Sequence, residues 1–222
     1  MKNEEVEKYE EDHDQVPYLY GEPPLHELNE PAPDYLSRSY TMEEYFGLEG
    51  SSEEKHEFFR GEVFVMQPPR LTHNLIVMNV SALLMQKLAG KGCRPHNSNQ
   101  RLHIPANTLC TYPDISVVCG KVQTLNNDEW NLLNPTVIFE VLSHSTRNYD
   151  RVRKFILYQS IPTLREYVLI DSEAIATEVY QVNGNGNWGM LRCNEPDKWI
   201  YLESIRVRLS LKKIYEGTKL VT

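Results

Sequence analysis

The chain has 222 residues, 41% of them hydrophobic and 10% aromatic, which fits a soluble globular protein with one well-cored domain. Its net charge of −8 arises entirely in residues 1–39, which hold eleven Asp or Glu against three Lys or Arg, whereas residues 40–222 carry twenty of each. The neutral remainder lacks the basic excess that favours tight phosphate binding, yet it does not exclude a nucleic-acid substrate. No apolar run is long enough to span a membrane, and no signal peptide is visible, so we expect a cytoplasmic protein.

The first 39 residues are rich in charge and proline and show no helical or strand period. We expect them to form an acidic arm, disordered or loosely packed, ahead of a single domain over residues 40–222. The four cysteines form no CxxC pair, so reduced, buried thiols are favoured over a zinc site or a disulfide framework.

The domain opens with local signals for two helices and a hairpin. Thr41 followed by Glu44 is a capping box for a short helix over 41–48. The stretch HEFFRGEVFVM (56–66) predicts two antiparallel strands around Arg60-Gly61. Thr72 is a candidate N-cap, and the apolar spacing that follows predicts an amphipathic helix over 73–89.

The second half reads mainly as strands. Strands are predicted at 101–104, 112–118, 136–142, 166–171, 177–182, 188–192, 199–201 and 205–209. A helix is predicted over 147–160, with Ser145 or Thr146 as its cap, and a last helical turn at 211–215. Helices between apolar strands indicate an α/β or α+β fold, with a mixed sheet covered on both faces.

Three acidic residues interrupt these apolar strands. Glu140 lies inside the run VIFEVL, Asp114 opens ISVV after Pro113, and Glu57 begins EFF. Two buried carboxylates repel each other and are costly to remove from water, whereas Mg²⁺ or Mn²⁺ relieves both penalties. Taken singly, Glu140 could belong to a satisfied ion pair or an exposed edge, and Asp114 to a turn. Together they predict a metal site if their strands pair.

The predicted helix after Glu140 carries Asp150, Lys154 and Tyr158 at spacings of four, on one face. Spacing alone favours a surface salt bridge between Asp150 and Lys154. In the functional alternative, Lys154 reaches over the carboxylates, where it orients an attacking water or offsets charge growing on a phosphate.

The order of these motifs resembles the Uma-type family of restriction-endonuclease-like proteins, in the PD-(D/E)XK nuclease superfamily. The resemblance covers residues 40–216 and rests on the segments HEFFRGEVFVM, Thr72-His73-Asn74, YPDISVV, NPTVIFEVLSHSTRNYDRVRKFILYQ and EYVLID. It implies a restriction-endonuclease-like core that binds Mg²⁺ (or Mn²⁺) and cuts DNA, acting as a homodimer. The catalytic residues it implies are Asp114, Glu140, Lys154 and Glu57, with metal bound by Asp114, Glu140 and Glu57, and with His73 and Tyr158 contacting substrate or supporting the site.

One position departs from the family pattern. Leu142 stands two residues after Glu140, where the motif has its lysine, so Lys154 is assigned as a lysine that has migrated to the next helix. The departure also supports a rival interpretation, a catalytically inactive protein that keeps the fold as a nucleic-acid-binding or interaction module. A hydrolase built on Ser143 and His144 is disfavoured, because adjacent residues of a strand point to opposite faces.

Overall fold

The computed structural model describes residues 38–144 and 146–221. The predicted acidic arm therefore lies outside the described residues except for its last two positions, and Ser145 lies outside them too. The disorder of the arm and the capping role of Ser145 stay predictions. No helix within the described ranges is long and apolar enough to cross a membrane.

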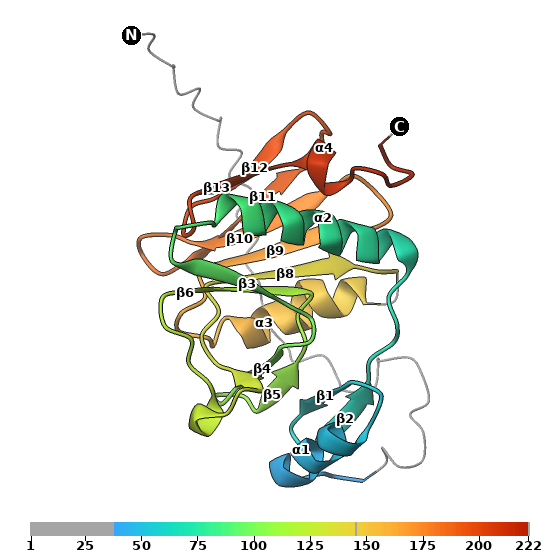
Figure 1. The fold of residues 1–222 in the computed structure, drawn as a ribbon, viewed down its shortest axis with the longest axis vertical. Coiled ribbons are helices and arrows are strands. Elements are labelled where there is room, and N and C mark those ends of the chain that lie inside the picture. The colour runs from blue at the N-terminus through green and yellow to red at the C-terminus, as the bar shows by residue number, and fades with distance from the viewer. Residues whose placement is uncertain (1–37, 145, 222) are drawn as a thin grey trace. The chain divides into compact units, whose positions relative to one another are not determined.

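The centre of the domain is a mixed six-stranded sheet (Figure 1). Its strands in spatial order are β11 (Trp188–Cys193), β10 (Thr177–Val182), β9 (Glu166–Asp171), β8 (Val137–Leu142), β6 (Ile115–Cys119) and β3 (Cys93–Asn97). The central neighbours β8 and β9 are parallel, and the other pairs are antiparallel. Both central strands are buried along their whole length, which explains their nearly continuous apolar sequences.

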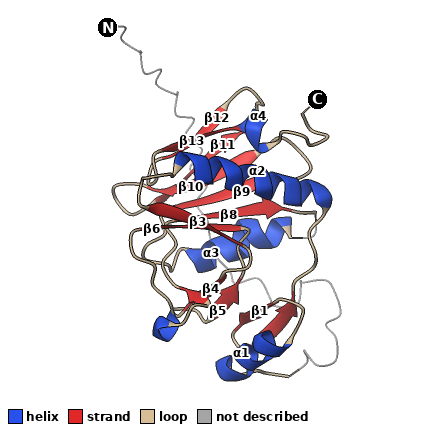
Figure 2. Ribbon diagram, in the orientation of Figure 1, coloured by secondary structure: helices blue, strands red, loops and turns tan. Residues whose placement is uncertain are grey.

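Helices cover the two faces of this sheet (Figure 2). Helix α2 (Leu71–Lys87) packs on one face with Val137, Phe139 and Val141 of β8. The opposite face receives the π-helical turn η4 (Tyr149–Lys154) and helix α3 (Phe155–Tyr158), which pack with Ile138 and Leu142. Because side chains alternate along a strand, Glu140 points to the same face as Ile138 and Leu142, toward η4 and α3.

A five-stranded sheet lies beside the central one in the fold. Its strands in order are β2 (Glu62–Val65), β1 (His56–Phe59), β5 (Leu109–Thr111), β4 (Arg101–Ile104) and β7 (Asn131–Leu132). Helix α1 (Met42–Ser51) packs Tyr45 on Phe58 of β1, with ring centroids 5.1 Å apart. The remaining elements are the 3-10 turn η3 (Leu125–Asn127), the pair β12 (Trp199–Leu202) and β13 (Val207–Ser210), and α4 (Leu211–Ile214).

The predicted fold class is confirmed, and several local predictions hold. The capping box of Thr41 and Glu44 opens α1, and β1 and β2 form the predicted hairpin. Its turn places Arg60 and Gly61 at φ values of 50° and 90°, the left-handed region that a tight hairpin turn requires and that suits glycine.

Other boundaries differ from the predictions. The N-cap of α2 is Arg70, without a side-chain cap, so Thr72 is not the cap. The strand predicted at 112–118 is β6 and begins at Ile115, so Asp114 precedes it. The single helix predicted over 147–160 is divided between η4 and α3. Strands β3, β5 and β7 were not predicted, because they are short and lack alternating apolar residues.

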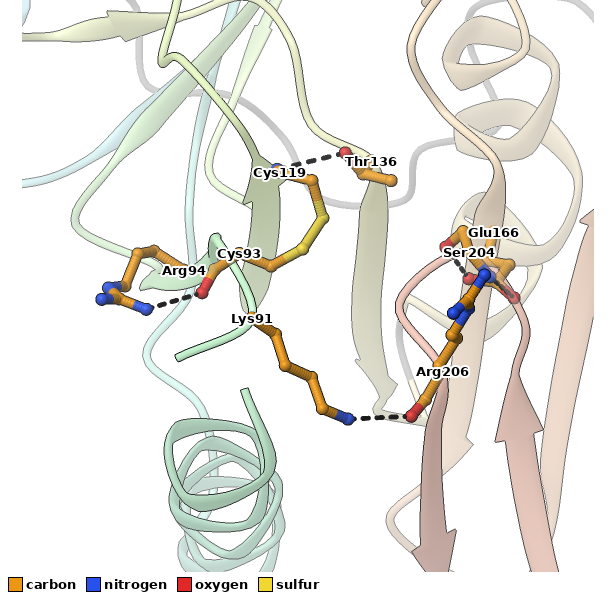
Figure 3. The surroundings of a disulfide bond; sticks show 8 residues. All are labelled: Lys91, Cys93, Arg94, Cys119, Thr136, Glu166, Ser204 and Arg206. Carbon is orange, nitrogen blue, oxygen red and sulfur yellow. Dashed lines mark hydrogen bonds between the residues drawn. A yellow bond between two sulfur atoms is a disulfide. The ribbon is translucent and has the colours of Figure 1, made fainter. Parts of the chain in front are cut away.

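The prediction of four reduced cysteines is wrong for two of them. Cys93 of β3 and Cys119 of β6 lie opposite each other in the antiparallel ladder and form a disulfide (Figure 3). Cys110 and Cys193 are free thiols. The two bonded cysteines are 26 residues apart in sequence, and only the pairing of their strands brings them together.

Candidate active site

Pairing of β6 with β8 brings Asp114 to Glu140. Ile115 lies opposite Phe139 in this antiparallel ladder, so the residue before β6 meets the middle of β8. The backbone N–H of Val141 donates to Oδ2 of Asp114 at 2.7 Å, and the backbone N–H of Asp114 approaches Oε2 of Glu140 at 3.4 Å. The predicted convergence of these two carboxylates is therefore a feature of the structure.

Glu140 is 5% exposed, and Oε1 of its carboxylate accepts two hydrogen bonds. The Lys154 ammonium lies 3.1 Å from this oxygen, and the Tyr158 hydroxyl donates to it at 2.8 Å. Burial raises the pKa of Glu140 to about 8, helped by the negative charges of Asp114 and Asp150 and opposed by Lys154 and Tyr158. Without a further cation, burial thus favours the protonated form of Glu140.

Lys154 is the centre of the cluster. Its ammonium lies 3.1 Å from Oε1 of Glu57, 3.1 Å from Oε1 of Glu140 and 3.4 Å from Oδ1 of Asp150. The carboxylates hold the pKa of Lys154 well above its usual value, against the opposing effect of burial. Lys154 is 5% exposed. The spacing to Asp150 had favoured a salt bridge on the surface, and this prediction is wrong because the pair is buried. The contact to Glu140 is a hydrogen bond, and those to Glu57 and Asp150 are ion pairs.

Glu57 enters from the other sheet. Strand β1 pairs with β5, so Thr111 at the end of β5 donates a short hydrogen bond from Oγ1 to Oε1 of Glu57. The Tyr149 hydroxyl donates to Oε2 of the same carboxylate at 3.2 Å. Glu57 thus contacts Lys154, Thr111 and Tyr149.

His73 lies in the first turn of α2 and contacts Asp114. Its Nε2 is 3.1 Å from Oδ2 of Asp114. The other ring nitrogen, Nδ1, is buried and has no hydrogen-bond partner among the described residues. His73 is 9% exposed, so this nitrogen is an open donor or acceptor next to the carboxylates.

The cluster is short of positive charge. The cluster holds four largely buried carboxylates, and Lys154 pairs with three of them, those of Glu57, Glu140 and Asp150. The fourth, Asp114, has the His73 ring as its ion partner and no lysine or arginine partner in the described part of the chain. Buried carboxylates are normally paired or bound to metal. The excess therefore calls for protons or a further cation.

The donor chemistry fits a hard divalent cation. Oδ1 of Asp114 accepts no hydrogen bond from the described residues, and Oε2 of Glu140 has only the 3.4 Å approach of a backbone N–H. Mg²⁺ is commonly held by one or two carboxylates plus waters and substrate phosphates. No group of three or more His, Cys, Asp or Glu side chains in residues 38–144 and 146–221 is preassembled around a metal position, so a two-carboxylate site is the form that fits.

Two members of the cluster were not foreseen from the sequence. Thr111 lies in β5, a three-residue strand without a clear pattern. Tyr149 precedes Lys154 by five residues, a spacing that on an α-helix turns the two side chains about 140° apart. All the site residues that were predicted from the sequence lie in this one cluster: Asp114, Glu140, Lys154, Glu57, His73 and Tyr158.

A mixed sheet covered by helices on both faces, with an Asp, a Glu and a Lys meeting beside two paired strands, defines the restriction-endonuclease-like fold of nucleases. The Uma2 family, described as "Putative restriction endonuclease", matches residues 42–212, and the chain belongs to this family. The family assignment supports a nuclease function.

The chain is also similar to individual proteins. The chain is 33% identical over 175 residues to "Uncharacterized protein slr1290" of Synechocystis sp., covering 79% of this chain and 90% of that protein. It is 34% identical over 148 residues to "Uncharacterized protein sll1609" of the same organism, covering 67% and 84%. Among solved structures, "a putative nuclease belonging to DUF820" from Anabaena variabilis has the same fold, with a TM-score of 0.61 and 19% identity over 74% of this chain and 91% of that one.

Proposed function

We propose that this protein is a metal-dependent endonuclease that hydrolyses phosphodiester bonds of DNA. The observation that carries the proposal is the excess of buried carboxylates around Asp114 and Glu140, beside a lysine ammonium. A structural cluster gains nothing from such an excess, whereas a site for a divalent cation and a phosphate requires it.

Asp114 and Glu140 are the proposed ligands for Mg²⁺ or Mn²⁺, with the backbone carbonyl of Val141 beside them. A divalent cation held there supplies Lewis-acid polarisation of a phosphate oxygen and a nucleophilic water at neutral pH. Glu57 was also predicted to bind metal. Its two oxygens already accept from Thr111, Tyr149 and Lys154, which favours a role in holding Lys154.

Lys154 is proposed to orient the attacking water or to offset the charge that grows on the phosphate. Because the ammonium already has three carboxylate neighbours, one of them must give way to water or substrate first. The longest contact, 3.4 Å to Asp150, is the weakest of the three and the one we expect to open. Tyr158 holds Oε1 of Glu140, and His73 is the proposed contact to a phosphate or support of the site, with its buried Nδ1 open to an ordered water.

Cleavage of both strands of a duplex calls for two copies of a single-site domain, so we propose a homodimer.

The cytoplasmic location also stays a prediction. The Cys93–Cys119 disulfide favours an oxidising compartment, since such bonds are rare where thiols are kept reduced.

Purified protein incubated with supercoiled plasmid and Mg²⁺ or Mn²⁺ tests the proposal. We expect nicking or linearisation that Asp114→Asn and Glu140→Gln each reduce by about 100-fold or more. Glu166→Gln is the matched control, because Glu166 is likewise a buried carboxylate in a strand, held by Ser204 outside the cluster (Figure 3). Equal cleavage by all four proteins would remove Asp114 and Glu140 from the mechanism.

The alternative is a catalytically inactive member that binds nucleic acid or a protein partner. Leu142, which is buried in the core where the motif has its lysine, favours it. Calorimetry with Mg²⁺ separates the cases: cation binding that Asp114→Asn abolishes, without cleavage of DNA or RNA, would support the inactive module.

A further inference from the structure

The turn that carries Lys154 is π-helical over Tyr149–Lys154, between an α-helical turn and α3. In an α-helix, residues five apart are separated by about 140° around the axis, whereas the i to i+5 repeat of a π-helix brings them onto one face. Tyr149 and Lys154 are five apart. Only the wider turn allows both side chains to face the same group.

That group is the Glu57 carboxylate. Tyr149 donates to its Oε2 at 3.2 Å, and Lys154 lies 3.1 Å from its Oε1. The ammonium also lies over the Tyr149 ring, 5.6 Å from the centroid. Residues i and i+5 of the turn therefore hold the two oxygens of one carboxylate, which comes from a different sheet.

The wider turn is also held from the central sheet. Tyr167 of β9 is fully buried, and its hydroxyl donates to the backbone carbonyl of Asp150 at 3.1 Å. Its ring packs on Phe155 and Tyr158, with centroids 5.9 and 5.2 Å away. A side-chain donor that satisfies a carbonyl inside the turn stabilises a departure from α-helical geometry.

We propose that the π-helical turn is the device that positions the Lys154 ammonium, with Tyr149 as a positioning residue that acts through Glu57. Narrowing the turn to an α-helix separates Tyr149 from Lys154 and releases the ammonium from Glu57. The consequence for catalysis rests on the proposed nuclease function, but the placement of Lys154 does not.

Deletion of Val152 tests the proposal, because removing one residue from a π-helical turn restores α-helical spacing. Val152 is 47% exposed, so its side chain contributes little to the core. Val152→Ala keeps the length of the turn and is the matched control. Lysine acylation mapped by mass spectrometry reports the placement: we expect Lys154 to be protected in the native protein and in Val152→Ala, and labelled in the deletion variant. Protection of Lys154 in a folded deletion variant would overturn the proposal.

Tyr149→Phe is the second variant, needed if the deletion prevents folding, which circular dichroism detects. It removes only the hydroxyl that holds Glu57. We expect faster acylation of Lys154 and a kcat for DNA cleavage reduced about tenfold with KM unchanged. Tyr215→Phe, which removes a buried hydroxyl bonded to Ala176 outside the cluster, is expected to change neither.

The two hypotheses fail separately. If the native protein cleaves no DNA, the nuclease proposal fails, while the acylation results still decide the placement of Lys154. If cleavage is normal and acylation of Lys154 is the same in the native protein, the deletion variant and Tyr149→Phe, the positioning role is wrong and the nuclease proposal stands.

Discussion

Two buried carboxylate clusters of this domain are built in opposite ways. In the first, Glu49 of α1 is surrounded by donors: the backbone N–H of His56 at 3.0 Å, the His56 ring at 2.7 Å, the Tyr112 hydroxyl and, at 3.7 Å, the Arg101 guanidinium. One carboxylate has several donors and a permanent positive charge beside it. Such a cluster is complete by itself and serves to fasten α1 to β1 and β4.

The second cluster has the opposite balance, with three carboxylates around the Lys154 ammonium and a fourth, Asp114, beside Glu140. Glu140 meets the shortage by keeping a proton, as its pKa of about 8 indicates. The difference teaches that burial of a carboxylate does not by itself mark a functional site. A deficit of compensating charge is the more informative feature, because it leaves the carboxylates to take up protons or a cation.

Removal of the ammonium is expected to have the largest effect. Lys154→Met leaves the carboxylates without their cation, and breaking a buried ion pair from one side costs about 3–5 kcal/mol. Urea unfolding in the presence of EDTA measures the loss in free energy of unfolding, and cleavage of plasmid is expected to cease. A loss below about 1 kcal/mol would mean that the stability of the second cluster does not depend on the Lys154 ammonium.

Divalent cations are expected to stabilise the second cluster only. At a cation concentration 100 times the Kd, binding to the folded state adds about 2.7 kcal/mol to the free energy of unfolding. Thermal melts with and without Mg²⁺ or Mn²⁺ should show a shift that Asp114→Asn abolishes and Glu49→Gln retains. An equal shift in Asp114→Asn would place the cation elsewhere.

Neutralising one carboxylate in each cluster is expected to change stability with opposite signs. Glu49→Gln loses hydrogen bonds to charged and neutral donors and should destabilise the protein by about 1–3 kcal/mol. Glu140→Gln removes a buried acid that is short of positive charge, so above pH 8 the metal-free variant should be more stable than the native protein. Chemical unfolding of both variants at pH 9 in EDTA makes the comparison. Destabilisation of similar size in both would contradict the difference between the clusters.

Per pH unit, the change of stability with pH is expected to be the smallest of these effects. The pKa of Glu140 rises from 4.5 to about 8 on folding, so the folded state retains a proton that the unfolded chain releases between these values. Stability of the metal-free protein should therefore fall as pH rises through this window, by at most about 1.4 kcal/mol per pH unit for this group. The pKa of Asp150 is also raised by burial, which adds to the same trend. Urea midpoints from pH 5 to pH 9 should show a slope that Glu140→Gln reduces; the same slope in both proteins would assign it to other groups.

Much of the site could be predicted because polar residues in apolar strands are visible locally. Asp114, Glu140 and Glu57 each interrupt a strand-like run, and Lys154 follows at helical spacing from Asp150. Tyr149 could not be found, since the sequence predicts an α-helix and an α-helix turns Tyr149 away from Lys154. Thr111 lies in a strand too short to be recognised. The buried state of the Asp150–Lys154 pair was equally hidden, because the same spacing is common on solvated helices.

The sequence by itself determined the local elements: the capping box of Thr41 and Glu44, the hairpin around Arg60 and Gly61, the apolar strands and the acids that interrupt them. Propensities and capping act over a few residues, so they can be read without the fold. Only the tertiary structure decided that Cys93 pairs with Cys119, that Glu57 from one sheet meets Lys154 beside the other, and that three carboxylates share one ammonium. Strand pairing and charge compensation join segments that are far apart in the chain, and no local pattern records those distances.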